Sequence, residues 1–392
     1  MLTLLVDAEV YAPRPLGRQT VVVCAGCIVH LAPDPSRLPA DLPHEVVDLD
    51  GLRLVPGLID GHAHLTGGGG EAGYASRVPP LALSRFTRAG VTTVVGVLGT
   101  DDLVRTPGEL IATARGLCEE GLTAYCHTGG YHLPPATLTG SVRGDIVHVD
   151  RVLGLGELAL SDHRSSQPTL DELLRLGSEV HVAGLMTGKA GIVHLHLGDG
   201  ERGLVLVRRA LDGCELPARV WNPTHVNRRR ALWEEACELA ARGCTIDVTA
   251  FPPDAAAAAD SDELSAAAAL GAYLDSGLPS ERITVSSDGG GCLPSFDAEG
   301  RVVRFDVGDP ATLAATLREL LDAGVPLERA LPPFTRNVAD LLRLPAKGRI
   351  EVGADADLVA LDASGRVRHV MAGGVWQVRD GETTRRGRFE PG

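Results

Sequence analysis

The amino-acid sequence predicts an α/β protein: a (β/α)8 TIM barrel with a small β-sandwich domain built from both termini. Three observations predict it. Short β-branched runs alternate with helix-like runs through the middle of the chain, whereas both ends carry β runs broken by turn residues. The length of 392 residues suits a barrel of roughly 250 residues with an addition. We place the β-sandwich domain at 1–54 and 346–392 and the barrel at 55–345.

The two ends of the chain resemble each other in pattern. Predicted strands occupy 2–5, 20–23, 28–31 and 45–47 at the N-terminal end and 357–361, 367–371 and 375–378 at the C-terminal end. Cys24 and Cys27 flank the turn Ala25-Gly26. No second cysteine pair completes a zinc site, so we interpret them as two packed thiols in a hairpin.

The middle of the chain supplies eight predicted barrel strands, at 52–59, 92–98, 123–128, 157–160, 192–197, 218–223, 245–250 and 283–287. The predicted helices are 80–89, 107–120, 170–185, 204–211, 229–242, 263–276 and 311–323, and several precede a glycine, a common C-cap. The alanine run 255–259 follows the seventh strand, and we interpret it as a loop that could act as a lid.

Composition excludes several classes of partner. The net charge of -14 argues against nucleic acid and anionic membranes and is more consistent with a small polar substrate. The eight cysteines form no disulfide-like framework, the N-terminus lacks a signal peptide, and no segment approaches ~18 uninterrupted apolar residues. We therefore expect a soluble, cytoplasmic protein. We also expect a homo-oligomer, although nothing in the sequence counts subunits.

The most informative stretch is Pro56 to Glu71, which contains His62 and His64 followed by four glycines. Alternate side chains of a strand share a face, so both imidazoles could bind one metal ion. The glycines would let a loop come close to a bound ligand. The alternative is a buried strand end with two hydrogen-bonded histidines.

Polar residues at the ends of other strands favour the metal. Active sites of such barrels lie at the C-terminal ends of the strands. Histidines and carboxylates from several strands are what a pair of divalent cations needs. The predicted ligands are His62, His64, Glu157, His196, His225 and Asp288. We expect His194 and His163 behind the ligands, and we interpret His127 and His132 as core or loop residues.

These residues, together with the tail segment 348–359, resemble the amidohydrolase superfamily. More narrowly, motifs along nearly the whole chain are similar to the isoaspartyl dipeptidases: 67–71 (GGGGE), 98–101 (LGTD), 130–132 (GYH), 161–164 (SDHR), 223–228 (PTHVNR) and 286–289 (SSDG). The resemblance implies a binuclear zinc enzyme that cleaves β-aspartyl dipeptides. It also implies that Thr100 contacts the substrate.

Two positions depart from that family. Glu157 stands where the family carries a carboxylated lysine that bridges the metals, and Lys189 lies before the fifth strand, where it is a poor substitute. A glutamate supplies the same carboxylate on a shorter stem, so the backbone must approach or the metals must shift. Cys292 stands where the family has a serine expected to touch substrate, so affinity or substrate choice is expected to differ.

The predicted chemistry is amide hydrolysis by a hydroxide shared between two cations, most simply zinc. One ion would be held by His62, His64, Glu157 and Asp288, and the other by Glu157, His196 and His225. Asp288 would take the proton of the hydroxide and pass it to the leaving amine. Tyr131 could donate a hydrogen bond to the oxyanion, unless it is a loop residue without a catalytic part.

Charges near the site predict the substrate class. Glu71 could bind an ammonium group, and Arg164 and Arg228 could each bind a carboxylate. An isoaspartyl dipeptide has that charge pattern. Two alternatives stay open: another amide hydrolase of the dihydroorotase, hydantoinase or N-acyl-amino-acid deacylase type, and a non-catalytic barrel that lost turnover when Glu157 replaced lysine.

Overall fold

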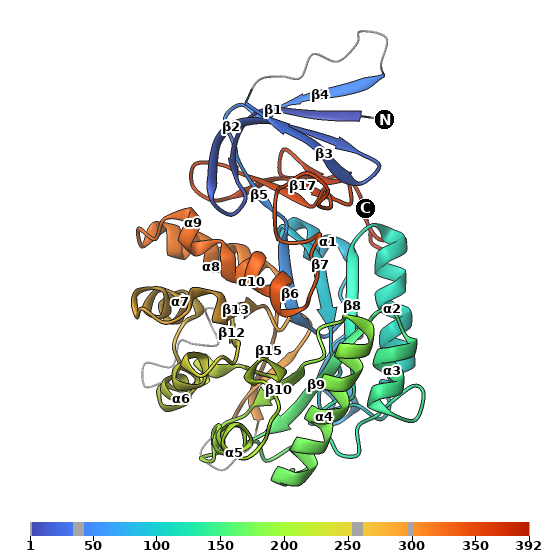
Figure 1. Cartoon of the computed structure of the whole chain (residues 1–392). Helices are drawn as coiled ribbons and strands as arrows, with labels where there is room; N and C mark the ends of the chain where they lie inside the picture. Colours follow the sequence, from blue (N-terminus) through green and yellow to red (C-terminus); the bar gives the residue numbers. More distant parts are fainter. Residues whose placement is uncertain (1, 34–42, 253–261, 297–301, 392) are drawn as a thin grey trace.

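The computed structural model describes residues 2–33, 43–252, 262–296 and 302–391. Strands from both ends of the chain gather at one end of the molecule, and the α/β part lies beside them (Figure 1). Both termini lie at the strand-rich end. Among the described residues, no helix is both long enough and apolar enough to cross a membrane.

The strand-rich end holds a nine-stranded sheet. Its strands are β1 (Leu2–Tyr11), β2 (Pro15–Cys24), β3 (Cys27–Ala32), β4 (His44–Asp48), β5 (Arg53–Pro56), β16 (Leu358–Leu361), β17 (Val367–Ala372), β18 (Val375–Arg379) and β19 (Glu382–Thr383). The two chain ends meet where β5 and β16 pair antiparallel. Cys24 and Cys27 oppose each other at the β2–β3 hairpin with free thiols, as predicted. The sandwich form and the domain boundaries stay predictions.

The α/β part contains a parallel sheet of six strands: β6 (Leu58–Ala63), β7 (Val91–Gly96), β8 (Thr123–Thr128), β9 (Val152–Leu160), β10 (Val193–Leu197) and β11 (Trp221–Thr224). A second parallel pair follows, β12 (Ile246–Thr249) with β13 (Ile283–Ser286). The helices are α1 (Leu83–Arg88), α2 (Pro107–Glu120), α3 (Val142–His148), α4 (Leu170–Thr187), α5 (Val205–Gly213), α6 (Arg230–Ala241), α7 (Ala266–Asp275), α8 (Ala311–Asp322), α9 (Leu327–Ala330) and α10 (Arg336–Leu341). The arrangement is the predicted TIM-barrel-like α/β fold.

Side chains join the two pieces of the sheet where the backbone ladder is interrupted. Between β11 and β12, Thr224 Oγ1 donates to Asp247 Oδ2 at 2.7 Å. After β13, the Ser287 amide donates to Asp60 Oδ1 of β6 at 3.0 Å, beside an isolated parallel bridge between Ala63 and Gly289. These contacts bring the two histidines after Asp60 close to the end of β13.

The structure corrects some predicted elements. The run 52–59 is two strands, β5 and β6, which belong to different sheets and separate at Gly57. A Cβ on Gly57 would lie 2.1 Å from Thr92 Oγ1, so only glycine fits there. The fourth barrel strand begins at Val152, before the predicted 157. Helix α3 and the hairpin of β14 (Cys292–Phe296) and β15 (Val302–Val307) were not predicted. The predicted lid at 255–259 lies outside the described residues.

Candidate metal centre and active site

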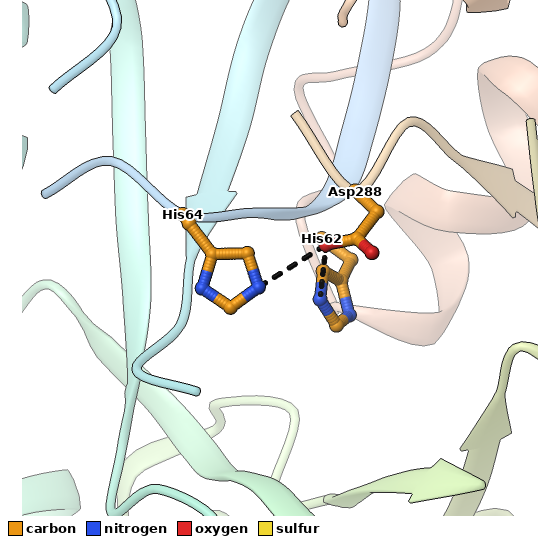
Figure 2. Close-up of side chains that lie close together, drawn as sticks. All are labelled: His62, His64 and Asp288. Carbon is orange, nitrogen blue, oxygen red and sulfur yellow. Dashed lines mark ion pairs between the residues drawn. The ribbon is translucent and has the colours of Figure 1, made fainter. Parts of the chain in front are cut away.

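The first group of predicted ligands comes together from β6 and the end of β13. His62 lies in β6, His64 directly follows that strand, and Asp288 follows β13. Asp288 Oδ1 lies 3.4 Å from His62 Nε2 and 3.1 Å from His64 Nε2. Figure 2 shows both imidazoles turned toward this carboxylate. All three side chains are buried.

Glu157 of β9 lies at the centre of the histidines. Its Oε1 is 3.3 Å from His64 Nε2, and its Oε2 lies within 3.1–3.6 Å of a nitrogen of each of the other three predicted histidine ligands, His62, His196 and His225. The Glu157 side chain is only 1% exposed. One carboxylate thus contacts four imidazoles from three strand ends, which is the position a bridging ligand requires.

Among the described residues, two groups of donor atoms are compact enough to hold an ion. They are His62, His64 and Asp288, and His62, Glu157 and His225, with the donor atoms of each group within 4.8 Å of one another. His196 is in neither group, although its Nδ1 lies 3.1 Å from Glu157 Oε2. Its Nε2 faces Asp162 Oδ2 at 3.0 Å. The assignment of His196 to the second ion therefore stays a prediction.

The donor set fits divalent cations. His62 Nε2 and Asp288 Oδ1 are buried, and although they lie only 3.4 Å apart, neither makes a hydrogen bond of suitable geometry with the described residues. Buried polar atoms without partners are rare, and an ion is one of the explanations for them. Imidazole nitrogens with carboxylate oxygens are the ligands that zinc and similar ions take.

The charges of the ligands support the same interpretation. Burial opposes ionisation of Glu157, but His62, together with hydrogen bonds from His196 and His225, holds the pKa of its carboxyl well below the usual range. His62 and His64 likewise outweigh burial and lower the pKa of Asp288. Burial lowers the pKa of His64, but Asp288 and Glu157 more than offset this and raise it to about 10, so that metal binding at this imidazole would release a proton. Both carboxylates are therefore ionised at neutral pH, as ligands must be.

Two of the ligands have unusual backbone conformations. His225 and Asp288 have positive φ angles of 61° and 51°, in the left-handed region that most residues avoid. Such strain costs on the order of 1–3 kcal/mol per residue and is concentrated at functional sites. His225 directly follows β11, and Asp288 lies two residues after β13. The turn at each position directs the side chain toward the other predicted ligands.

The other histidines fall into distinct environments. His127 is buried, neither ring nitrogen has a hydrogen-bond partner among the described residues, and burial lowers its pKa well below the usual value, which agrees with a core residue. His132 contacts Asp102 at 3.1 Å. The prediction that His163 lies behind the ligands is wrong, because its side chain is 76% exposed on the loop after β9.

A small cavity beside the ligands contains most of the predicted substrate-binding residues. Its volume is about 30 Å³, room for about two water molecules. Predicted residues that line it are His64, Glu71, Thr100, Tyr131, Glu157, Arg164, His196, Asp288 and Cys292. Residues that lie between positions 64 and 292 of the sequence thus line one space, as the strand-end argument predicted.

Arg164 and Glu71 contact each other in this cavity. Arg164 Nη1 lies 3.3 Å from Glu71 Oε1. The same guanidinium binds Asp162 through two hydrogen bonds, from Nε at 3.0 Å and Nη2 at 2.8 Å, and lies over the Tyr131 ring at 5.4 Å. The Arg164 guanidinium is expected to bind the carboxylate of the substrate, and the Glu71 carboxylate its ammonium group. These two groups are therefore adjacent.

Tyr131 and Cys292 are both uncharged at neutral pH. Burial and Glu157 raise the pKa of the Tyr131 phenol well above its usual value. Its hydroxyl lies 2.9 Å from His196 Nδ1, at the edge of the ligand cluster. Burial, reinforced by Glu71, raises the pKa of the Cys292 thiol to about 11.

Arg228 lies apart from the cavity. It is not among the lining residues. Its Nη1 is 3.6 Å from Asp199 Oδ1, and its guanidinium lies 5.7 Å from the centre of the Phe251 ring. Its part in substrate binding stays a prediction.

Two residues important to the site were missed in the sequence. Asp162 contacts both His196 and Arg164, and its place in the 161–164 motif was the available signal. Arg105 is 4% exposed and donates to the main-chain oxygens of Thr66 and Val78, on both sides of the glycine loop. Arg105 belongs to no motif in the sequence, so nothing there indicated that it would bind the glycine loop.

Comparison with known proteins gives a consistent family. Residues 53–377 match the model of the amidohydrolase family. A β-aspartyl dipeptidase from Fervidobacterium islandicum AW-1, solved in complex with β-Asp-Leu, superimposes with a TM-score of 0.93 and 41% identity over 100% of this chain and 99% of that one.

More distant proteins share the fold. A dihydropyrimidinase from Brevibacillus agri superimposes with a TM-score of 0.70 at 17% identity, over 99% of this chain and 97% of that one. Among curated proteins, a deacetylase from Agrobacterium fabrum is 26% identical over 85% of this chain and 78% of its own length.

Proposed function

The chain belongs to the amidohydrolase family and, within it, to the β-aspartyl dipeptidases, and from that premise we propose that it hydrolyses β-aspartyl dipeptides with two divalent cations, most simply zinc. The observation that carries the proposal is the position of Glu157. Its carboxylate contacts all four predicted histidine ligands. The resemblance to the isoaspartyl dipeptidases implies a bridging carboxylate at that position.

The two ions, when bound, would supply a nucleophilic hydroxide near neutral pH and polarise the scissile carbonyl. The ligands would be His62, His64 and Asp288 on one side and His196 and His225 on the other, with Glu157 between them. Asp288 is the proton carrier that we propose. Its carboxylate is ionised at neutral pH and can therefore accept a proton from the hydroxide, and we propose that it returns this proton to the leaving amine.

Tyr131 is the proposed oxyanion donor. Its raised pKa keeps the proton on the phenol, so the hydroxyl can donate a hydrogen bond to developing negative charge. Its contact with His196 places that hydroxyl beside the ligands. The neutral phenol and the ionised Asp288 thus have complementary roles.

Glu71 and Arg164 are the proposed pair that binds the ammonium and carboxylate of the substrate, with Thr100 and Cys292 beside them and Arg228 reaching the far carboxylate. Glu71 and Arg164 contact each other in the cavity. We propose that this ion pair separates when substrate enters, each partner exchanging the other for a substrate charge.

A second candidate is deacylation of another N-acyl amino acid. The distant likeness to a deacetylase and the replacement of a substrate-binding serine by Cys292 favour it. Hydrolysis of N-acetyl amino acids in preference to β-Asp-Leu would support this second function.

The test is metal content and β-Asp-Leu hydrolysis for the wild type and Glu157→Ala. We expect about two metals per chain and activity, with both lost in the variant. Glu179→Ala, an exposed acid on α4, is the control and should behave like the wild type. Full activity without Glu157 would contradict the bridging role. Metal-loaded wild type that hydrolyses no amide would support the non-catalytic alternative.

We further propose a cytoplasmic homo-oligomer and a β-sandwich domain formed by 1–54 and 346–392. The antiparallel pairing of β5 with β16 supports the union of the two ends. Light scattering of the purified protein tests the first proposal, and limited proteolysis with mass spectrometry tests the domain boundaries.

A further inference from the structure

A chain of three buried hydrogen bonds runs from His62 away from the metal side. His62 Nδ1 lies 2.8 Å from His194 Nε2, and His194 Nδ1 lies 2.6 Å from Asn222 Oδ1. The Asn222 amide nitrogen donates to the main-chain oxygen of Thr245 at 2.7 Å. The three side chains are at most 2% exposed. His194 and Asn222 are register partners on β10 and β11.

The Thr245 carbonyl at the end of this chain fixes which of the other groups donate and which accept. A main-chain carbonyl only accepts hydrogen bonds, so the amide nitrogen of Asn222 must face Thr245 and its oxygen must face His194. That oxygen also only accepts, so His194 carries its proton on Nδ1. His194 Nε2 is then an acceptor, and His62 must carry its proton on Nδ1.

The opposite tautomer of His62 would leave one unfavourable contact somewhere along the chain. With His62 protonated on Nε2, two lone pairs would face each other at 2.8 Å between His62 and His194. Reversing His194 moves the same conflict to Asn222, and reversing Asn222 moves it to the carbonyl of Thr245. A buried contact of this kind leaves two acceptors without a donor between them, which is unfavourable.

We propose that Asn222 and His194 are positioning residues that hold His62 in the Nδ1-protonated tautomer and so keep the lone pair of its Nε2 directed at the metal. His62 Nε2 is the atom that faces Glu157 and Asp288. His64 has no such support, because its Nδ1 has no hydrogen-bond partner among the described residues. His62, which occurs in both compact ligand groups, is the ligand that this chain of hydrogen bonds fixes.

The inference rests on the metal site of the proposed function, and zinc binding rather than turnover tests it. Zinc affinity of metal-free protein is measured by competition with a chelator for the wild type, His194→Phe and Asn222→Leu. Loss of a residue that orients a histidine ligand typically weakens metal binding about 10- to 100-fold. We expect that loss for His194→Phe and a smaller loss in the same direction for Asn222→Leu.

The matched control is His127→Phe. His127 is also buried and stacks on His194 with ring centres 5.5 Å apart, but it contributes no hydrogen bond to the chain. It should retain wild-type zinc affinity. His194→Gln can accept from His62 and donate to Asn222, so it should restore most of the affinity lost in His194→Phe. Thermal unfolding of the metal-free variants separates a folding defect from a metal defect.

Nitrogen-15 NMR of the zinc-loaded wild type tests the tautomer without any variant. We expect a proton on Nδ1 of both His62 and His194. A His62 ring protonated on Nε2, or His194→Phe that binds zinc as tightly as the wild type, overturns the inference and leaves the proposed function intact. A wild type that binds no zinc contradicts the proposed function instead.

Discussion

At the scale of single residues, Asp162 connects a proposed metal ligand, His196, with a proposed substrate-binding residue, Arg164. Its carboxylate binds the Arg164 guanidinium with both oxygens and also contacts His196 Nε2. Burial raises the pKa of Asp162, but His196 and Arg164 outweigh it and hold the pKa well below the usual range. A change at this one carboxylate should therefore affect a ligand and a substrate-binding residue together.

We predict that Asp162→Asn lowers kcat/KM for β-Asp-Leu about 10- to 100-fold, mainly through KM. The amide cannot accept from both Arg164 nitrogens and His196, and each hydrogen bond to a charged group is worth about 1.5–3 kcal/mol. Steady-state kinetics measures the changes in kcat and KM, and zinc analysis measures the metal content of the variant. Asp212→Asn, which removes an exposed partner of Arg242, is the control. An unchanged KM would show that Asp162 does not position Arg164.

At the scale of elements, the loop after β6 depends on glycine and on one buried arginine. Gly67 has a φ of +79°, and a Cβ there would lie 1.9 Å from the oxygen of Val78. Arg105 holds the two sides of this loop through the main-chain oxygens of Thr66 and Val78, and it also binds Asp101 Oδ2 at 3.1 Å. The loop carries Glu71 into the cavity.

Arg105→Met should loosen that loop. We expect KM for β-Asp-Leu to rise about tenfold and the free energy of unfolding to fall by about 3 kcal/mol, because buried carbonyl oxygens lose a charged donor. Denaturant unfolding and kinetics measure the two effects. Arg77→Met removes another arginine beside Asp101, but Arg77 is 32% exposed, so the loss should be much smaller. Equal losses in both variants would refute the special role of Arg105.

At the scale of the whole molecule, Lys347 joins the terminal sheet to the α/β part. Its Nζ lies 2.6 Å from Asp357 Oδ2, just before β16, and 2.7 Å from Thr123 Oγ1 at the start of β8. Asp355 lies 2.9 Å away. Burial lowers the pKa of Lys347, but Asp357 and Asp355 outweigh it, so the pKa is raised above the usual 10.5.

Lys347→Met should cost about 3–5 kcal/mol at pH 7, because it leaves the buried carboxylate of Asp357 without its cation. A lysine whose pKa is raised on folding stabilises fully below its unfolded pKa, and this stabilisation is lost as pH rises through the folded pKa. The difference from the wild type should therefore shrink above about pH 10.5. Urea unfolding of the variant and the wild type, at pH 7 and above about pH 10.5, measures this difference in the free energy of unfolding.

The control for Lys347 is the other lysine. Lys189 donates to the main-chain oxygens of Ile146 and Val149 within the α/β part, and burial lowers its pKa. The free energy of unfolding of the wild type, relative to Lys189→Met, should therefore rise rather than fall as the pH increases. A Lys347→Met variant as stable as the wild type at pH 7 would mean that the two parts are joined by other contacts.

The sequence by itself determined the alternation of strands and helices and the positions of the polar residues at strand ends. His62 and His64 could be interpreted because alternate residues of a strand share a face, a local rule that needs no tertiary structure. The same rule, with the convergence of strand ends in a barrel, placed Glu157, His225 and Asp288 in one site.

Only the tertiary structure decided how the side chains pair. The need for glycine at position 57 depends on Thr92, and the link from His194 to Asn222 depends on the register of β10 and β11. Arg105 reaches main-chain carbonyls of a loop that is distant in sequence. Arg228, close in sequence to His225, lies outside the cavity lining. Periodicity along the chain sets which face a residue occupies, whereas hydrogen-bond partners depend on distances between strands that are far apart in sequence.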